Sequence, residues 1–158
     1  MKAASVKEIK DELKFRPQAD LLSICLRLAR FKKENKELLT YLLFESHDEF
    51  AYIENVKKEI DEQFKQVNRK SYYYIRKSVR KILTTTKKYI RYSQNKQTEV
   101  ELLLHFCFKL KGFSPSIKHN KTLRNIFQRQ VDAIRKTISG LHEDLQFDYE
   151  SELNKLLE

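Results

Sequence analysis

Glycine and proline are almost absent from this chain, and their scarcity limits the folds that it can adopt. Its 158 residues include only two glycines and two prolines, too few for the tight turns of a many-stranded sheet, which depend on these residues. Leucine, lysine, glutamate, arginine and glutamine are abundant, and all five favour helices. We therefore predict an all-α protein, and its length fits a single domain over residues 1–158.

Signals for helix ends divide the chain into about eight helices. The S/T-x-x-E capping box satisfies free backbone N–H groups at a helix start, and it occurs as Ser5 with Glu8, Ser46 with Glu49 and Thr98 with Glu101. Pro17 and Pro115 suit the first turn of a helix, and Gly112 and Gly140 suit a left-handed cap at a helix C-terminus. The predicted helices lie near 5–14, 17–33, 35–45, 47–68, 71–94, 98–111, 115–139 and 141–157.

Three segments are apolar on most faces of a helix and are expected to form the central layer of the fold: 19–31, 38–44 and 100–110. The longer helices instead repeat apolar residues every three or four positions, so each turns one stripe toward the core. Short connections favour antiparallel helix hairpins, which either stack as a HEAT-like α–α array or fold as an irregular helical bundle. No repeat of fixed period decides between the two.

Positive charge is concentrated in one segment of the chain. No acidic residue lies between Glu62 and Glu99, yet residues 63–98 include eleven lysines and arginines and five of the eight tyrosines. The other 122 residues hold 21 basic and 22 acidic side chains, so the net charge of +10 comes from this segment. Such a segment is typical of a surface that meets an acidic partner.

The predicted helix 71–94 places these cations on one side. At 100° per residue, an apolar stripe that includes Ile75, Val79, Ile82, Thr86 and Ile90 faces the core. The opposite side is basic with tyrosines at its borders, and we name it the cationic face. With its flanking residues, this candidate binding face spans 69–92 and consists of Arg69, Tyr73, Tyr74, Arg76, Lys77, Arg80, Lys81, Lys87, Lys88, Arg91 and Tyr92.

Like charges four residues apart on a helix repel each other, so something else is expected to neutralise the cationic face. The acidic residues of the predicted helices 47–68 and 141–157 are one candidate. From the sequence we expect a non-catalytic binding or scaffold protein whose cationic face engages an acidic protein partner. Nucleic acid is the alternative, with Tyr73 or Tyr74 stacking on unpaired bases. An anionic membrane surface is disfavoured because the apolar stripe is needed for the core. A homo-oligomer is possible but is not indicated by the sequence.

No combination of residues points to catalysis, a metal or a cofactor. The four histidines are spread over four elements without metal-ligand spacing, and Gln146 stands where a zinc motif beginning at His142 needs its second histidine. Two glycines leave no material for a phosphate-binding loop. We nominate no catalytic residue, metal ligand or cofactor, and a binding protein is favoured over an enzyme.

The cysteines and the lengths of the apolar runs indicate in which cellular compartment the protein is expected. Cys25 and Cys107 lie in apolar stretches and are predicted to be core thiols. The longest strongly apolar runs, 38–44 and 100–108, are far shorter than the roughly 18 residues of a membrane span, and the first ten residues do not read as a secretory signal. A soluble, cytoplasmic protein without membrane insertion is expected.

Three segments carry a family resemblance: ENKELLTYLLFE (34–45), KQTEVELLLHFCFKLK (96–111) and LHEDLQFDYESEL (141–153). Together they resemble a group of small, uncharacterised bacterial all-helical proteins. The resemblance implies a helical fold and supplies no activity for this chain.

Overall fold

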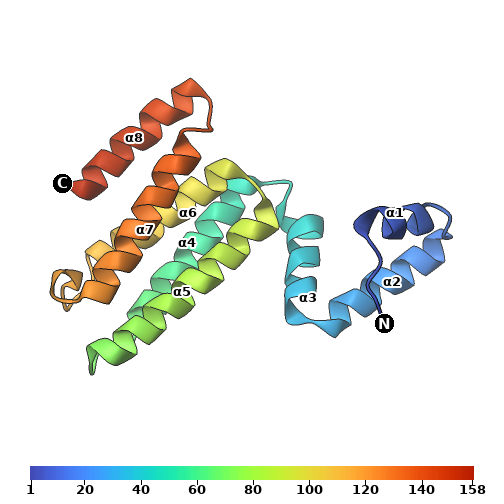
Figure 1. Cartoon of the computed structure of the whole chain (residues 1–158), viewed down its shortest axis with the longest axis horizontal. Helices are drawn as coiled ribbons and strands as arrows, with labels where there is room; N and C mark the ends of the chain where they lie inside the picture. The colour runs from blue at the N-terminus through green and yellow to red at the C-terminus, as the bar shows by residue number, and fades with distance from the viewer. The chain divides into compact units, whose positions relative to one another are not determined.

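The computed structural model describes residues 1–158 and contains eight α-helices and no β-strand, so the fold is all-α as predicted (Figure 1). In chain order the elements are α1 (Val6–Lys14), α2 (Gln18–Phe31), α3 (Lys33–Thr40), the π-helix η1 (Tyr41–Glu45), α4 (Glu49–Lys65), α5 (Tyr72–Ser93), α6 (Lys96–Lys111), the 3-10 helix η2 (Ile117–His119), α7 (Lys121–Ile138) and α8 (Glu143–Leu157). The contacts group into two compact units, unit 1 (Met1–Phe44) and unit 2 (Glu45–Glu158). The prediction of a single domain over 1–158 stays a prediction.

Helix α6 is the centre of unit 2, where it packs against α4, α5, α7 and α8. Its buried side chains are Val100, Leu102, Leu103, Leu104, Phe106, Cys107 and Leu110, which confirms the core position predicted for 100–110. The ring of Phe106 lies 5.7 Å from that of Phe64 on α4, within the range of favourable aromatic pairs. Because one helix contacts all four others, unit 2 is a bundle and not an array in which each hairpin meets only its neighbours.

The other helices of unit 2 each turn one stripe toward α6. The buried apolar residues of α4 and α7 mostly recur every three or four positions: Tyr52, Ile53, Val56, Ile60 and Phe64 on α4, and Leu123, Ile126, Val131, Ile134 and Ile138 on α7. Helix α8 contributes Tyr149, Leu153 and Leu156. The predicted stripes are therefore right in the main. Phe50, the first residue of the apolar repeat predicted for the helix 47–68, is an exception because its side chain is exposed.

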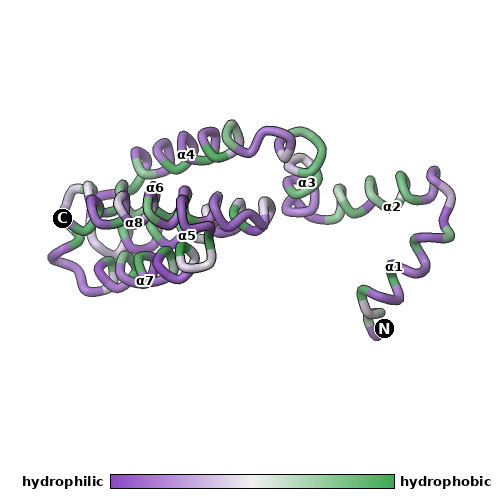
Figure 2. The backbone as a smooth tube through the Cα atoms, turned by 90° about the horizontal axis from the view of Figure 1, so that it is seen from above, coloured by the Kyte–Doolittle hydropathy of each residue, from purple (hydrophilic) through white to green (hydrophobic).

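Unit 1 contradicts the expected central layer. Helices α1, α2 and α3 have no buried residue, and in the segment 38–44 only Tyr41 is buried. Leu22 is 60% exposed and Phe31 76% exposed, and Figure 2 shows hydrophobic residues recurring along α2. The prediction for 19–31 and 38–44 is wrong because 44 residues with three short helices offer too little neighbouring surface to cover α2. Cys25 is likewise exposed, whereas Cys107 is a buried core thiol as predicted.

Of the three predicted capping boxes, only the first is formed. The backbone N–H of Ser5 donates to Glu8 at 2.7 Å, and the N–H of Glu8 donates to the Ser5 hydroxyl at 3.3 Å. Helix α4 is capped by Asp48 and α6 by Asn95. The hydroxyls of Ser93 and Thr98 instead donate to Glu49, which ties the start of α4 to the end of α5 and the start of α6.

The predicted glycine caps and the second proline start are also wrong. No glycine has a positive φ, and the left-handed C-terminal cap of the structure is Gln94, with φ 54° at the end of α5. Pro115 precedes the short helix η2, and α7 begins only at Lys121, after Asn120 as its N-cap. The chain therefore ends α5 at Gln94 and begins α6 and α7 after Asn95 and Asn120, none of which the sequence signals indicated.

Candidate functional site

Helix α5 anchors unit 2 on one side and presents cations on the other. Ile75, Val79, Ile82 and Thr86 are buried, as the predicted stripe requires, and Ile90 is half-buried. On the opposite side, the side chains of Lys77, Arg80, Lys81, Lys87 and Arg91 are exposed, and those of Arg76 and Lys88 are half-buried. The cationic face thus lies at the surface of unit 2.

Most of these cations have no partner within the chain. No ion pair or hydrogen bond engages the side chains of six of them: Arg76, Lys77, Arg80, Lys81, Lys87 and Arg91. The ammonium of Lys88 lies over the ring of Tyr89, 5.8 Å from its centroid, at the outer range of a cation–π contact. Six charges on one helix face are therefore left to solvent or to a partner.

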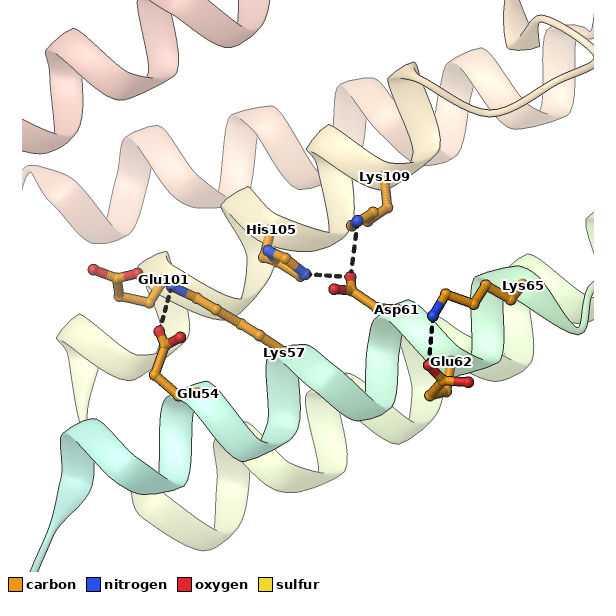
Figure 3. A network of polar contacts seen from close by, with 8 residues as sticks. All are labelled: Glu54, Lys57, Asp61, Glu62, Lys65, Glu101, His105 and Lys109. Carbon is orange, nitrogen blue, oxygen red and sulfur yellow. Dashed lines mark hydrogen bonds and ion pairs between the residues drawn. The ribbon is translucent and has the colours of Figure 1, made fainter.

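The acidic residues of α4 are used elsewhere (Figure 3). Asp61 lies 2.6 Å from His105 and 3.1 Å from Lys109, both on α6, while Glu62 pairs with Lys65 of its own helix. Glu59 and Glu49 reach only the border of α5, where the carboxylate of Glu59 accepts a hydrogen bond from the Tyr89 hydroxyl at 2.9 Å and that of Glu49 accepts one from the Ser93 hydroxyl. Helix α4 therefore does not cover the cationic face.

The acidic helix α8 does not cover it either. Helix α8 packs against α7 and α6, and Figure 1 shows it on the side of α7 that is remote from α5. Its exposed acids include Glu143, Asp144, Asp148 and Glu150. The chain's own acidic helices, which the sequence left open as a cover, thus do not neutralise the six cations named above, and these side chains lie at the surface of unit 2.

The tyrosines at the borders of the cationic face differ in their availability. Tyr73 and Tyr74, at the N-terminal end of α5, are 61% and 44% exposed, and their rings meet edge to face at 5.3 Å. Tyr92, at the other end, is half-buried and packs against Tyr89 at 6.1 Å. Two aromatic rings are therefore accessible, both beside the start of α5.

Arg69 lies in the connection before α5, outside the helix that carries the other cations of the candidate binding face. Helix α5 begins at Tyr72, and the guanidinium of Arg69 in the preceding connection stacks over the ring of Phe113 at 4.5 Å. The first turn of α5 holds no acidic residue and Ser71 makes no side-chain cap. The positive end of the helix dipole therefore adds to the cations near Tyr73 and Tyr74.

A polar network that the sequence reading missed joins α4 to α6 and α8. Lys57 donates to Glu101 at 2.7 Å and to Glu54 at 3.3 Å, and the Tyr149 hydroxyl donates to Glu101 at 2.8 Å. The sequence contained a signal for this network. Lys57 and Asp61 are four residues apart on α4, and α6 repeats charged or titratable residues at the same spacing with complementary charge: Glu101, His105 and Lys109.

Proton affinities within the network reflect its ion pairs. Burial opposes ionisation of Asp61, but hydrogen bonds and charges from His105 and Lys109 outweigh it and lower the pKa of Asp61. Burial likewise opposes the charge on Lys57, yet Glu101 and Glu54 outweigh it and raise the pKa of Lys57. Both shifts favour the charged forms, so the network acts as a set of structural ion pairs.

The structure assembles no group of three or more histidine, cysteine, aspartate or glutamate side chains that could hold a metal ion. None of its helices combines the length and the apolar character required to cross a membrane. No protein-family model, curated protein or solved structure matches the chain. The resemblance to small bacterial helical proteins stays a prediction, and the candidate site rests on its own geometry.

Proposed function

We propose that the protein binds nucleic acid, with the cationic face of α5 in contact with the phosphate backbone. The supporting observation is the row of six cations from Arg76 to Arg91, none of which has an ion pair within the chain. Fifteen residue steps at 1.5 Å each make this row roughly 22 Å long, enough to follow several phosphates. Binding would release the counterions condensed on the nucleic acid, which drives association at low salt.

The make-up of the cationic face favours nucleic acid over an acidic protein partner. The residues between Arg76 and Arg91 on this side of α5 are lysines, arginines and Thr84, with no aliphatic side chain among them. Protein–protein interfaces have an apolar centre from which charged residues are depleted, whereas nucleic-acid interfaces are polar and strongly positive. This comparison reverses the preference that the sequence alone suggested.

Single-stranded nucleic acid suits the face best. Tyr73 and Tyr74 are exposed beside the first cations of the row, where unpaired bases can stack on their rings. Such stacking contributes about 1–3 kcal/mol per base and tolerates any sequence. We therefore expect binding without marked sequence preference, and stronger binding to single strands than to duplexes.

A salt titration tests the proposal. Fluorescence anisotropy with labelled single-stranded and double-stranded DNA and RNA of about 20 nucleotides should detect binding at about 50 mM salt. If all six cations meet phosphates of a single strand, a plot of log K against log salt should have a slope of about −4. Absence of binding at about 50 mM salt, or binding with a flat salt dependence, would contradict the proposal.

Two variants with the same net charge distinguish the contribution of the cationic face to nucleic-acid binding from that of the overall charge. Four cations of the face are replaced in Lys77→Gln/Arg80→Gln/Lys87→Gln/Arg91→Gln, and four exposed cations near or on α7 in Lys118→Gln/Lys121→Gln/Arg129→Gln/Lys136→Gln. The first variant should weaken binding at least ~10-fold and flatten the salt slope. The second, with the same net charge, should bind within about threefold of the wild type, and equal losses in both would contradict a specific face.

An acidic protein partner is the second candidate, supported by the spacing of the cations. Arg76 with Arg80, Lys77 with Lys81, and Lys87 with Arg91 are each four residues apart, a repeat that an acidic helix can match with carboxylates at the same spacing. In this case the chain should show no affinity for nucleic acid. A pull-down with the wild type should then retain one defined acidic protein that the four-residue α5 variant loses.

A further inference from the structure

Unit 1 holds most of the exposed large apolar side chains of the protein. Thirteen of nineteen lie in its 44 residues: Met1, Val6, Ile9, Phe15, Leu22, Ile24, Leu26, Leu28, Phe31, Leu38, Leu42, Leu43 and Phe44. Isolated exposed apolar residues are ordinary, but a concentration of this kind marks an interaction surface. The feature is independent of the cationic face, which belongs to unit 2.

The exposed residues of α2 lie on both sides of its covered face. At 100° per residue, the polar side chains between Asp20 and Arg30 occupy one strip of α2, and apolar residues fill the rest of its circumference from Ala19 to Phe31. Leu21 and Ala29 are half-buried, whereas Cys25 between them is exposed, so unit 1 covers this side only in part. Leu28 and Phe31 are exposed to one side of it, and Leu22 and Leu26 to the other.

Unit 1 lacks the neighbours needed to cover these residues. Its other helices, α1 and α3, have nine and eight residues, and Tyr41 is its only buried residue. Chains of about 40 residues generally need disulfides, metals or oligomerisation to fold stably. Both cysteines are free and no metal-ligand group is present, so the apolar side chains of unit 1 need a surface from outside unit 1 to cover them.

We propose that unit 1 pairs with unit 1 of a second copy of this chain and forms a two-fold symmetric helical dimer. The area fits: at roughly 100 Å² for each exposed large side chain, unit 1 offers on the order of 1,000 Å² of apolar surface. A stable interface of standard size needs about 800 Å² from each partner. A two-fold interface is self-complementary, so the same edges of α2 serve both copies.

The composition of the rest of the chain agrees with a second copy as the occupant. Unit 1 carries ten basic and six acidic side chains, so charge repulsion opposes the pairing of two copies and the burial of apolar surface must outweigh it. Unit 2 offers few apolar residues as a cover: its six exposed large ones are spread over α4, α5, α6 and α8. A second unit 1 supplies the matching surface that unit 2 lacks.

The molar mass in solution tests the dimer. Light scattering coupled to size-exclusion chromatography of the full chain at about 100 µM should give twice the 19.0 kDa of one chain. Dilution to the µM range and below should dissociate it with a measurable Kd. A monomer at every concentration would overturn the proposal and would indicate that another protein, or the chain's own unit 2, covers α2.

Two variants with equal charge change locate the interface. Leu22→Glu/Leu26→Glu places two acids on one apolar edge of α2 and should raise the dimer Kd at least ~100-fold, since each copy loses two buried leucines. Ser23→Glu/Arg30→Gln changes the polar strip by the same net charge and should leave the Kd within about threefold. Should the glutamate variant lose helicity by circular dichroism, Leu22→Ala/Leu26→Ala replaces it. If neither the glutamate nor the alanine replacement of Leu22 and Leu26 changed the dimer Kd, the placement of the interface on α2 would be overturned.

Discussion

Oδ1 of Asp61 lies 2.6 Å from Nε2 of His105, and this contact joins α4 to the central helix α6. Lys109 approaches the same oxygen at 3.1 Å, and the pair lowers the pKa of Asp61 in the folded chain. A carboxylate whose pKa is lower in the folded state stabilises the protein above its unfolded pKa of about 3.9. That stabilisation disappears as the pH falls through the lower folded pKa.

Asp61→Asn should therefore reduce the free energy of unfolding by about 1 kcal/mol at pH 7. The difference from the wild type should shrink as the pH falls below the unfolded pKa, and it should vanish once the pH lies below the lowered pKa of the folded carboxylate. Urea denaturation at several pH values measures both quantities. Asp148→Asn, at an exposed site on α8, is the control and should change stability by less than ~0.5 kcal/mol at any pH. A pH-independent loss in Asp61→Asn would contradict the ionic origin of the effect.

Glu101 links three helices, because it accepts a hydrogen bond from Lys57 of α4 and another from Tyr149 of α8. Tyr149→Phe removes one of these bonds without leaving a cavity and should cost about 1 kcal/mol. In a double-mutant cycle with Glu101→Gln, the two losses should not add, and a coupling energy of at least ~0.5 kcal/mol is expected from equilibrium denaturation. Strict additivity would show that the bond contributes nothing to stability.

The sequence predicted where most helices lie, but it did not predict which of the apolar helices are buried by their neighbours. Segments 19–31 and 100–110 read alike, yet Leu103 is buried while Leu22 is exposed. An apolar helix surface shows that a segment is able to be buried, whereas burial itself depends on how many other helices surround it. Four helices surround α6 in unit 2, and unit 1 offers α2 only two short ones.

For the candidate site, too, the sequence predicted the arrangement of side chains on one helix but not what surrounds that helix. The separation of cations from Ile75 and Val79 follows from helical winding alone, and the burial of α5 agrees with it. Whether the cations are open depends on where Asp61 and the acids of α8 lie, which is a tertiary property. Glu101 was misread for a related reason: a four-residue cap motif matched it locally, while in the folded chain it binds Lys57.

Phe106 and Phe108 lie on the same helix, and only the first belongs to the core. Phe106 is fully buried beside Phe64, whereas Phe108 is 46% exposed. Phe106→Ala should lower the free energy of unfolding by about 3–5 kcal/mol through lost burial and a cavity. Phe108→Ala is the matched control and should cost less than ~1 kcal/mol. Chemical denaturation compares them, and similar losses at both positions would contradict the placement of α6.

Cys107 offers a direct probe of the core of unit 2. It is fully buried on α6, and burial raises the pKa of its thiol to about 12. Only the thiolate reacts with disulfide reagents, so at pH 8 its ionisation alone should slow the reaction on the order of a thousandfold relative to an ordinary thiol. In a Cys25→Ser chain, labelling at pH 8 should therefore be nearly absent in buffer and rapid in denaturant. Because labelling then requires opening of the bundle, adding Phe106→Ala should accelerate the labelling of Cys107 in buffer. Prompt labelling of Cys107 in the chain that retains Phe106 would show that α6 is not enclosed.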